Sequence, residues 1–113
     1  MTPNEQSILL ILIEEIISST EKFSTCPIEE IPLGRMENFL RKQVKILSDV
    51  TPCLPREVGA RLQKLRGYFE AWISSGDIPS WVEDAGDPDL DLRRFALTEW
   101  RKTHRDLKSL WVR

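Results

Sequence analysis

The most apolar stretch of the chain runs from Ile8 to Ile13, six consecutive apolar residues that Glu14 and Glu15 follow. At 3.6 residues per turn these residues form a broad apolar stripe along a helix. A helix that is apolar on most of its surface is either buried on most sides, or buried on one side and offered to a partner on another. We therefore expect the other elements to pack around this helix. Its main stripe comprises Ile8, Leu9, Leu12, Ile13 and Ile16, widened by Leu10 and Ile11.

The start of this helix carries a capping signal. Thr2 is placed to cap it, Pro3 occupies the first helical position, where its missing N–H costs nothing, and Glu5 completes a capping box. The helix is expected to end near Phe23, because the proline- and glycine-containing segment 24–34 is typical of a connector.

Three further segments, 35–50, 55–75 and 90–112, repeat apolar residues at helical spacing. Asp87 or Asp89 is expected to cap the last of them. Alternating, strand-like runs do not occur, so the pattern predicts an all-α fold. The expected inner faces comprise Met36, Phe39, Leu40, Val44 and Leu47 in the first segment, Val58, Leu62, Leu65, Phe69, Trp72 and Ile73 in the second, and Leu92, Ala96, Trp100, Thr103, Leu107, Leu110 and Trp111 in the third.

The predicted architecture is a compact four-helix bundle, with up to one additional short helical turn near residues 78–83, forming a single domain over residues 1–113. A chain of 113 residues fits one domain and can hold a hydrophobic core without metal or disulfide bonds. Its 41% hydrophobic and 30% charged residues argue against disorder throughout.

The apolar run is too short to span a bilayer, which takes roughly 20 residues. A secretory signal needs positive charge ahead of its apolar run, and here the nearby charge is that of Glu5. We therefore expect a cytoplasmic protein with no membrane contact. Cys26 and Cys53 have no CxxC spacing and no neighbouring histidine, which favours free reduced thiols and leaves a disulfide between them as the alternative.

The net charge of −2 conceals a strong segregation of charge along the chain. Residues 1–33 carry one base and six acids, giving −5, whereas residues 34–76 carry eight bases and four acids, giving +4. Residues 77–92 carry six acids and no base, and residues 93–113 carry seven bases and two acids. Such alternating blocks indicate faces that recognise each other within the fold, or a basic surface for an anionic partner.

Signals of catalysis are absent from the sequence. It contains no GxSxG, P-loop, GxGxxG, HExxH or paired CxxC motif. His104, the one histidine, lies on the flank of the last predicted helix, where an edge position is the commoner role. The aspartates between Asp84 and Asp91 do not follow the frame of a calcium-binding loop. We expect a non-enzyme with no metal, no cofactor and no small-molecule substrate.

Basic residues recur opposite the expected core on three helices. Four of them in the segment 90–112 fall within about 60° of one another and form a stripe roughly 20 Å long. Aligned basic faces contact phosphates by charge without reading bases, and basic faces that only keep a bundle soluble are the alternative. The nucleic-acid-binding candidates are Arg94, Arg101, Arg105 and Lys108, followed by Arg41, Lys42, Lys45, Arg56 and Lys64. Trp81 and Trp111 are candidate anchors for a partner protein, or lids on the bundle.

In its size, its helical pattern, its lack of catalytic motifs and its basic faces, the chain resembles the small subunits of CRISPR effector complexes. The faces in question bear Arg41, Lys42 and Lys45, and then Arg94, Arg101, Arg105 and Lys108. The resemblance covers the whole chain. It implies a helical bundle, present in more than one copy within a multi-protein antiviral complex, that holds single-stranded DNA or RNA by its backbone.

Two other classes of function remain open. One is a protein-binding adaptor or inhibitor that docks on a basic partner through the acidic segment 77–91 and Trp81. The other is a homodimeric structural bundle, in which the surplus apolar surface of the first helix pairs with its own copy.

Overall fold

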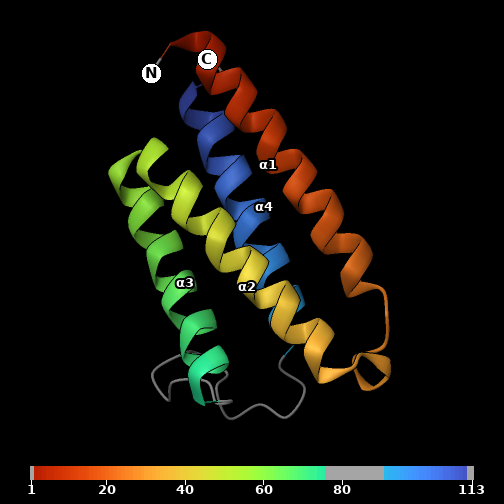
Figure 1. Ribbon diagram of the computed structural model, residues 1–113. Coiled ribbons are helices and arrows are strands. Elements are labelled where there is room, and N and C mark those ends of the chain that lie inside the picture. The colour runs from red at the N-terminus through yellow and green to blue at the C-terminus, as the bar shows by residue number, and fades with distance from the viewer. Residues whose placement is uncertain (1, 76–90, 112–113) are drawn as a thin grey trace. The chain divides into compact units, whose positions relative to one another are not determined.

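The computed structural model describes residues 2–75 and 91–111, and this part of the chain contains four α-helices and no strand. The all-α class with four helices is therefore confirmed, and the predicted helix ends are correct to within two residues. The short turn expected near residues 78–83 lies outside the described residues. The helices are α1 (Pro3–Ser24), α2 (Leu33–Val50), α3 (Arg56–Ser75) and α4 (Leu92–Trp111), with the 3-10 turns η1 (Ile28–Glu30) and η2 (Thr51–Cys53) between them (Figure 1).

By its internal contacts the chain divides into two compact units. Met1–Pro27 and Asp91–Arg113 form the first, which we call the α1–α4 unit, and Ile28–Leu90 forms the second, the α2–α3 unit. Each unit is therefore built on one pair of helices and is described by itself. The expectation of a single domain over residues 1–113 stays a prediction.

In the α1–α4 unit the two helices lie side by side and run antiparallel (Figure 1). Two polar pairs fix the register of the two helices. Glu14 contacts His104, and Glu21, which lies farther along α1, contacts Arg101, which comes earlier in α4. The prediction that Thr2 caps α1 is confirmed, because the hydroxyl of Thr2 accepts a hydrogen bond from the Glu5 N–H at 3.2 Å. The carboxylate of Glu5 accepts from the Thr2 hydroxyl at 3.1 Å, so the reciprocal backbone bond of a capping box stays a prediction. The buried apolar residues of this unit are Leu9, Ile13, Ile16, Leu92, Ala96, Leu97, Trp100 and Leu107.

Helix α1 is buried along one side only. Leu9 and Ile13 are buried, whereas Ile8 is 65% exposed and Leu12 is 41% exposed. Of the five stripe residues, Leu9, Ile13 and Ile16 are therefore buried and Ile8 and Leu12 are not, and Ile11 is also exposed, at 56%. Of the two alternatives that the sequence left open, the structure shows burial on one side and not on most sides. In a helix this uniformly apolar, the contacts with the neighbouring helix select the buried side, and the pattern alone does not.

In the α2–α3 unit, η2 joins two helices that pack against each other (Figure 1). Arg66 of α3 donates a hydrogen bond to the hydroxyl of Ser48 on α2 at 3.2 Å. Gly59 lies so close to η2 that a Cβ there would be 3.3 Å from the carbonyl oxygen of Thr51. The buried apolar residues of this unit are Met36, Leu40, Leu47, Val50, Val58, Leu62, Leu65 and Phe69.

Candidate nucleic-acid interface

The four basic residues predicted to form a stripe on the last helix are all exposed on α4. They occupy the face opposite Trp100 and Leu107, which are fully buried. The side chain of Arg105 is 75% exposed and that of Arg101 is 54% exposed. At 1.5 Å per residue the stripe from Arg94 to Lys108 is about 21 Å long. We call Arg94, Arg101, Arg105 and Lys108 the α4 basic stripe.

Acidic residues of α1 border this stripe. Glu21 accepts a hydrogen bond from Nη2 of Arg101 at 3.1 Å, and Oε1 of Glu14 lies 3.0 Å from Nε2 of His104. The carboxylate of Glu21 is more than half exposed, so solvent screens its attraction for Arg101. Glu21 therefore neutralises part of the charge of Arg101 and ties the edge of the stripe to α1.

In the C-terminal half of the stripe, acidic residues neutralise less of the positive charge. Arg105 meets Asp106 only at 3.9 Å, between neighbours in sequence that do not face each other on a helix. The structure shows no ion pair between Lys108 and another residue within 2–75 or 91–111. Arg105 and Lys108 are therefore the members of the α4 basic stripe most available to an anion.

The second group of candidates, on the α2–α3 unit, is also exposed but does not form one site. Arg41 is held by Glu37 one turn earlier on α2, with Nη2 2.7 Å from Oε1. Arg41 and Lys45 line a shallow depression of about 460 Å³ between α2 and α3, together with Val44, Glu70, Ile73 and Ser74. Lys42, Arg56 and Lys64 are exposed outside the lining of this depression.

The two tryptophans predicted to anchor a partner have different outcomes. Trp81 lies outside the described residues. Trp111 is half-buried at the end of α4, while its neighbour Leu110, expected on the inner face, is 46% exposed. The prediction for Leu110 is therefore wrong, because the periodicity shows the direction in which a residue points but not how far along the helix the packing surface continues.

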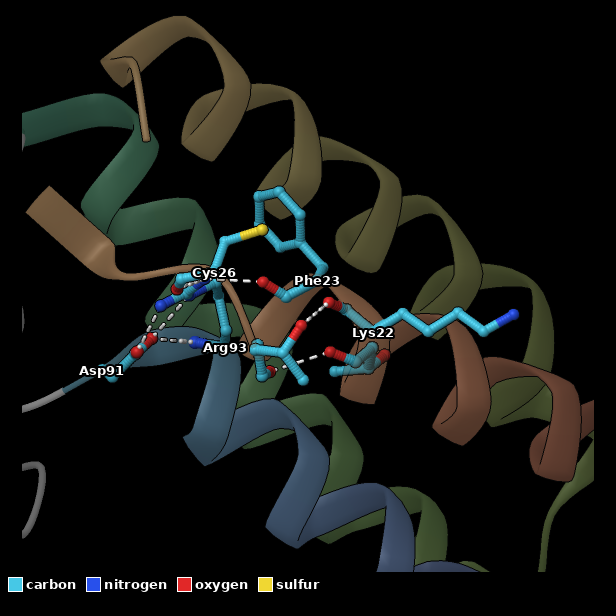
Figure 2. A network of polar contacts seen from close by, with 8 residues as sticks. Lys22, Phe23, Cys26, Asp91 and Arg93 are labelled. Atoms are coloured by element: carbon cyan, nitrogen blue, oxygen red, sulfur yellow. Dashed lines mark hydrogen bonds and ion pairs between the residues drawn. The ribbon is translucent and has the colours of Figure 1, made fainter. Parts of the chain in front are cut away.

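A buried arginine that the sequence pattern did not reveal holds α4 against the end of α1. Arg93 is 1% exposed, and its guanidinium lies between the carboxylate of Asp91 and two carbonyl groups, one in the last turn of α1 and one just beyond its end (Figure 2). Nη1 donates to the carbonyl oxygen of Phe23 at 2.6 Å and to that of Cys26 at 2.8 Å. The guanidinium carbon also lies 5.4 Å from the centroid of the Phe23 ring, within the range of a cation–π contact.

Asp91 completes this network and caps α4. Its Oδ1 accepts from the backbone N–H of Arg93 at 2.9 Å and from Nε at 3.1 Å, and its Oδ2 accepts from Nη2 at 2.8 Å. Asp91 therefore takes the capping role expected of Asp87 or Asp89, which lie outside the described residues. Burial by itself raises the pKa of the Asp91 carboxyl, but the hydrogen bonds and charge of Arg93, with the charge of Arg94, hold that pKa below its ordinary value.

Because Arg93 satisfies the Phe23 carbonyl in the last turn of α1, it acts as a C-terminal cap supplied from the other helix. Thr25 provides a second cap, since its hydroxyl donates to the carbonyl oxygen of Lys22 at 2.7 Å. These contacts fix the junction of α1 and α4, and so they position the α4 basic stripe relative to Glu21.

Membrane-spanning helices and metal sites were also searched for within residues 2–75 and 91–111. No helix there is long and apolar enough to cross a membrane. No group of three or more His, Cys, Asp or Glu side chains converges there in a way that could hold a metal ion. Cys26 and Cys53 are exposed and free, so the prediction of unpaired thiols is confirmed.

No match was found for this chain among models of protein families, among curated proteins or among solved structures. The resemblance to the small subunits of CRISPR effector complexes therefore stays a prediction from the sequence pattern.

Proposed function

We propose that the protein is a non-enzymatic subunit of a nucleoprotein assembly, which contacts the backbone of single-stranded DNA or RNA through the α4 basic stripe. The observation that supports this proposal is the exposure of all four bases along one line of α4, while the opposite face of the same helix is buried. The stripe contacts phosphates by charge and positions the strand, but it carries no aromatic or amide group that reads bases.

Several details favour Arg105 and Lys108 as the residues that contribute most. The ion pair with Glu21 neutralises part of the charge of Arg101, and Arg94 lies close to the carboxylate of Asp91 at the start of the helix. Arg105 and Lys108 are three residues apart, so their side chains lie on neighbouring turns of one face. A strand that follows this face meets two adjacent cations with little acidic compensation.

The α2–α3 unit offers a secondary contact under the same proposal. Arg41 and Lys45 are four residues apart on α2 and border the same depression, so they form a second pair of neighbouring cations. Glu37 holds Arg41 and Glu70 lies in the lining, which makes this pair weaker than the pair on α4.

The test is the affinity of a labelled single-stranded oligonucleotide for the wild type and for Arg105→Gln/Lys108→Gln. Glutamine has a helix propensity similar to that of arginine and lysine and remains polar, so it removes the charge without disturbing the helix, although its side chain is shorter. The matched control is Lys22→Gln/Lys102→Gln, which removes the same charge from exposed positions outside the stripe.

We expect the stripe variant to bind several-fold more weakly than the control, and by a similar factor for oligonucleotides of different sequence, because phosphate contacts carry no sequence information. Equal losses in the two variants would mean that net charge, not the stripe, determines binding. The absence of binding by the wild type at low salt would exclude the proposed function.

A further inference from the structure

Helix α1 presents a cluster of large apolar side chains to solvent. Ile8 is 65% exposed, Ile11 is 56% exposed and Leu12 is 41% exposed. Spaced three and four residues apart, they form one contiguous patch. Single exposed apolar residues are normal on a protein surface, but an adjoining group marks an interaction site. Among the residues that the structure describes, the other exposed large hydrophobic residue is Leu110 of α4, at 46%.

Acidic residues close both ends of this patch. Glu5, Ile8, Leu12 and Glu15 follow one another at spacings of three, four and three, which places them on one line along the helix. All four are exposed, and Ile11 lies beside the line. We call these five residues the α1 seam. The first base along α1 is Lys22, about 10 Å beyond Glu15, so the seam is apolar in its middle and negative at its ends.

A second copy of the chain is a poor occupant of this seam. Antiparallel pairing that sets Ile8 against Leu12 of the second copy also sets Glu5 against its Glu15. Parallel pairing sets each glutamate against the same glutamate of the other copy. Both symmetric arrangements bring like charges together at the two ends of the apolar contact, which is unfavourable.

Other described parts of this chain also lack the matching chemistry. The α2–α3 unit is rich in bases, but none of its described large hydrophobic residues is exposed, so it presents no apolar patch to the seam. The segment 77–91 carries six acids and no base, so it cannot supply cations to the ends of the seam. The exposed Leu110 has bases nearby in α4, but one leucine cannot cover a patch of three large side chains. The charge pattern therefore requires a partner with both apolar and basic residues on one face.

We propose that the α1 seam is the docking site for a basic amphipathic helix of another protein. Such a helix inserts apolar side chains between Ile8, Ile11 and Leu12 and places lysine or arginine opposite Glu5 and Glu15. This inference is independent of the proposed function and goes beyond it. Negative charge at both ends of the seam repels phosphates, so the seam selects a cationic protein segment while the α4 basic stripe selects an anionic strand.

The experiment uses a fluorescently labelled, helix-stapled peptide of about five turns. It presents two leucines four residues apart, with a lysine three residues before the first and another three residues after the second. The reference peptide replaces both lysines with glutamates. Fluorescence anisotropy then gives the affinity of each peptide for the full chain.

We expect the lysine peptide to bind at least about tenfold more tightly than the glutamate peptide at low salt, and this difference to shrink as salt is added. Ile8→Gln/Leu12→Gln is expected to weaken the lysine peptide by about tenfold or more, whereas the control Leu110→Gln leaves it unchanged. Glutamine is a good helix former, so far-UV circular dichroism should show the same helicity for both variants.

Glu15→Lys separates docking from a structural effect. Glu15 makes no contact that holds the capped start of α1, where Glu5 accepts a hydrogen bond from the hydroxyl of Thr2 at 3.1 Å. We expect this variant to bind the lysine peptide several-fold more weakly and the glutamate peptide more tightly, which a general loss of structure cannot produce.

Three results would each overturn the inference. The first is equal binding of the two peptides, or binding of neither. The second is binding that Ile8→Gln/Leu12→Gln leaves unaffected. The third is a wild-type chain that sediments as a dimer while Ile8→Gln/Leu12→Gln sediments as a monomer, since the seam would then bind a second copy of the chain.

Discussion

Replacing Arg93 with methionine is the perturbation whose effect follows most directly from the structure. Arg93→Met keeps most of the aliphatic stem but removes every side-chain donor. It leaves the carboxylate of Asp91, which is 10% exposed, without its ionic partner, and it leaves the carbonyl oxygens of Phe23 and Cys26 without the guanidinium. The variant therefore affects the α4 cap and the C-terminal end of α1 together.

The magnitude follows from the groups left behind. Breaking a buried ion pair by removing one partner costs about 3–5 kcal/mol, and each unsatisfied buried acceptor costs about 1–3 kcal/mol. Here the Asp91 carboxylate keeps the backbone N–H of Arg93 as a donor and reaches some water, which reduces the cost. We expect Arg93→Met to lower the free energy of unfolding by about 3 kcal/mol, a large share of the roughly 5–15 kcal/mol of a typical domain.

The assay is urea unfolding followed by far-UV circular dichroism, with Arg94→Met as the matched control. Arg94 is the next residue in α4 and is exposed, so its replacement should change the free energy of unfolding by less than about 0.5 kcal/mol. A cost below about 1 kcal/mol for Arg93→Met, or equal costs for the two variants, would refute the role assigned to Arg93.

Two further predictions concern stability. Gly67→Ala should raise the free energy of unfolding by about 0.5–1 kcal/mol, because the added Cβ meets no atom within 4 Å in the middle of α3. Gly59→Ala should give no gain, because its Cβ would lie 3.3 Å from the backbone oxygen of Thr51. Thermal unfolding of the two variants and the wild type tests this difference. The pKa of Asp91 is lower in the folded state than its unfolded value of about 3.9. The ionised carboxylate therefore stabilises the fold fully at pH values above the unfolded pKa, and this stabilisation is lost as the pH falls through the folded pKa. The free energy of unfolding, measured from pH 7 to pH 2, should therefore decline below about pH 4, and it should decline less for Asp91→Asn. The same decline in the wild type and in Asp91→Asn would show that the ion pair of Asp91 with Arg93 does not contribute to stability.

The sequence pattern predicted the helices well, because local signals determine where they begin and end. Thr2 caps α1 as expected, and Ala96, Trp100 and Leu107 are buried on α4 at the predicted helical spacing. The exposure of the α4 basic stripe follows from the same periodicity, since residues opposite a buried face point to solvent.

The pattern failed where tertiary contacts decide the outcome. Arg93 lies seven residues before Trp100, so its position indicated the inner face, but a pattern of polar and apolar residues assigns every arginine to the surface. The carbonyl groups that hold it lie 67 and 70 residues away in the sequence. The depression beside Arg41 and Lys45 was not predictable either, because it depends on how α3 packs against α2.

The salt dependence of single-stranded oligonucleotide binding tests the central claim most directly. For single strands, the slope of log K against log salt is about −0.7 for each phosphate contact, so four bases of the α4 basic stripe predict a slope of about −2.8. Loss of Arg105 and Lys108 to glutamine should reduce it to about −1.4, while Lys22→Gln/Lys102→Gln should leave it unchanged. A wild type that does not bind at low salt, or a slope that is the same in the wild type and the stripe variant, would contradict the assignment of α4 as the nucleic-acid contact.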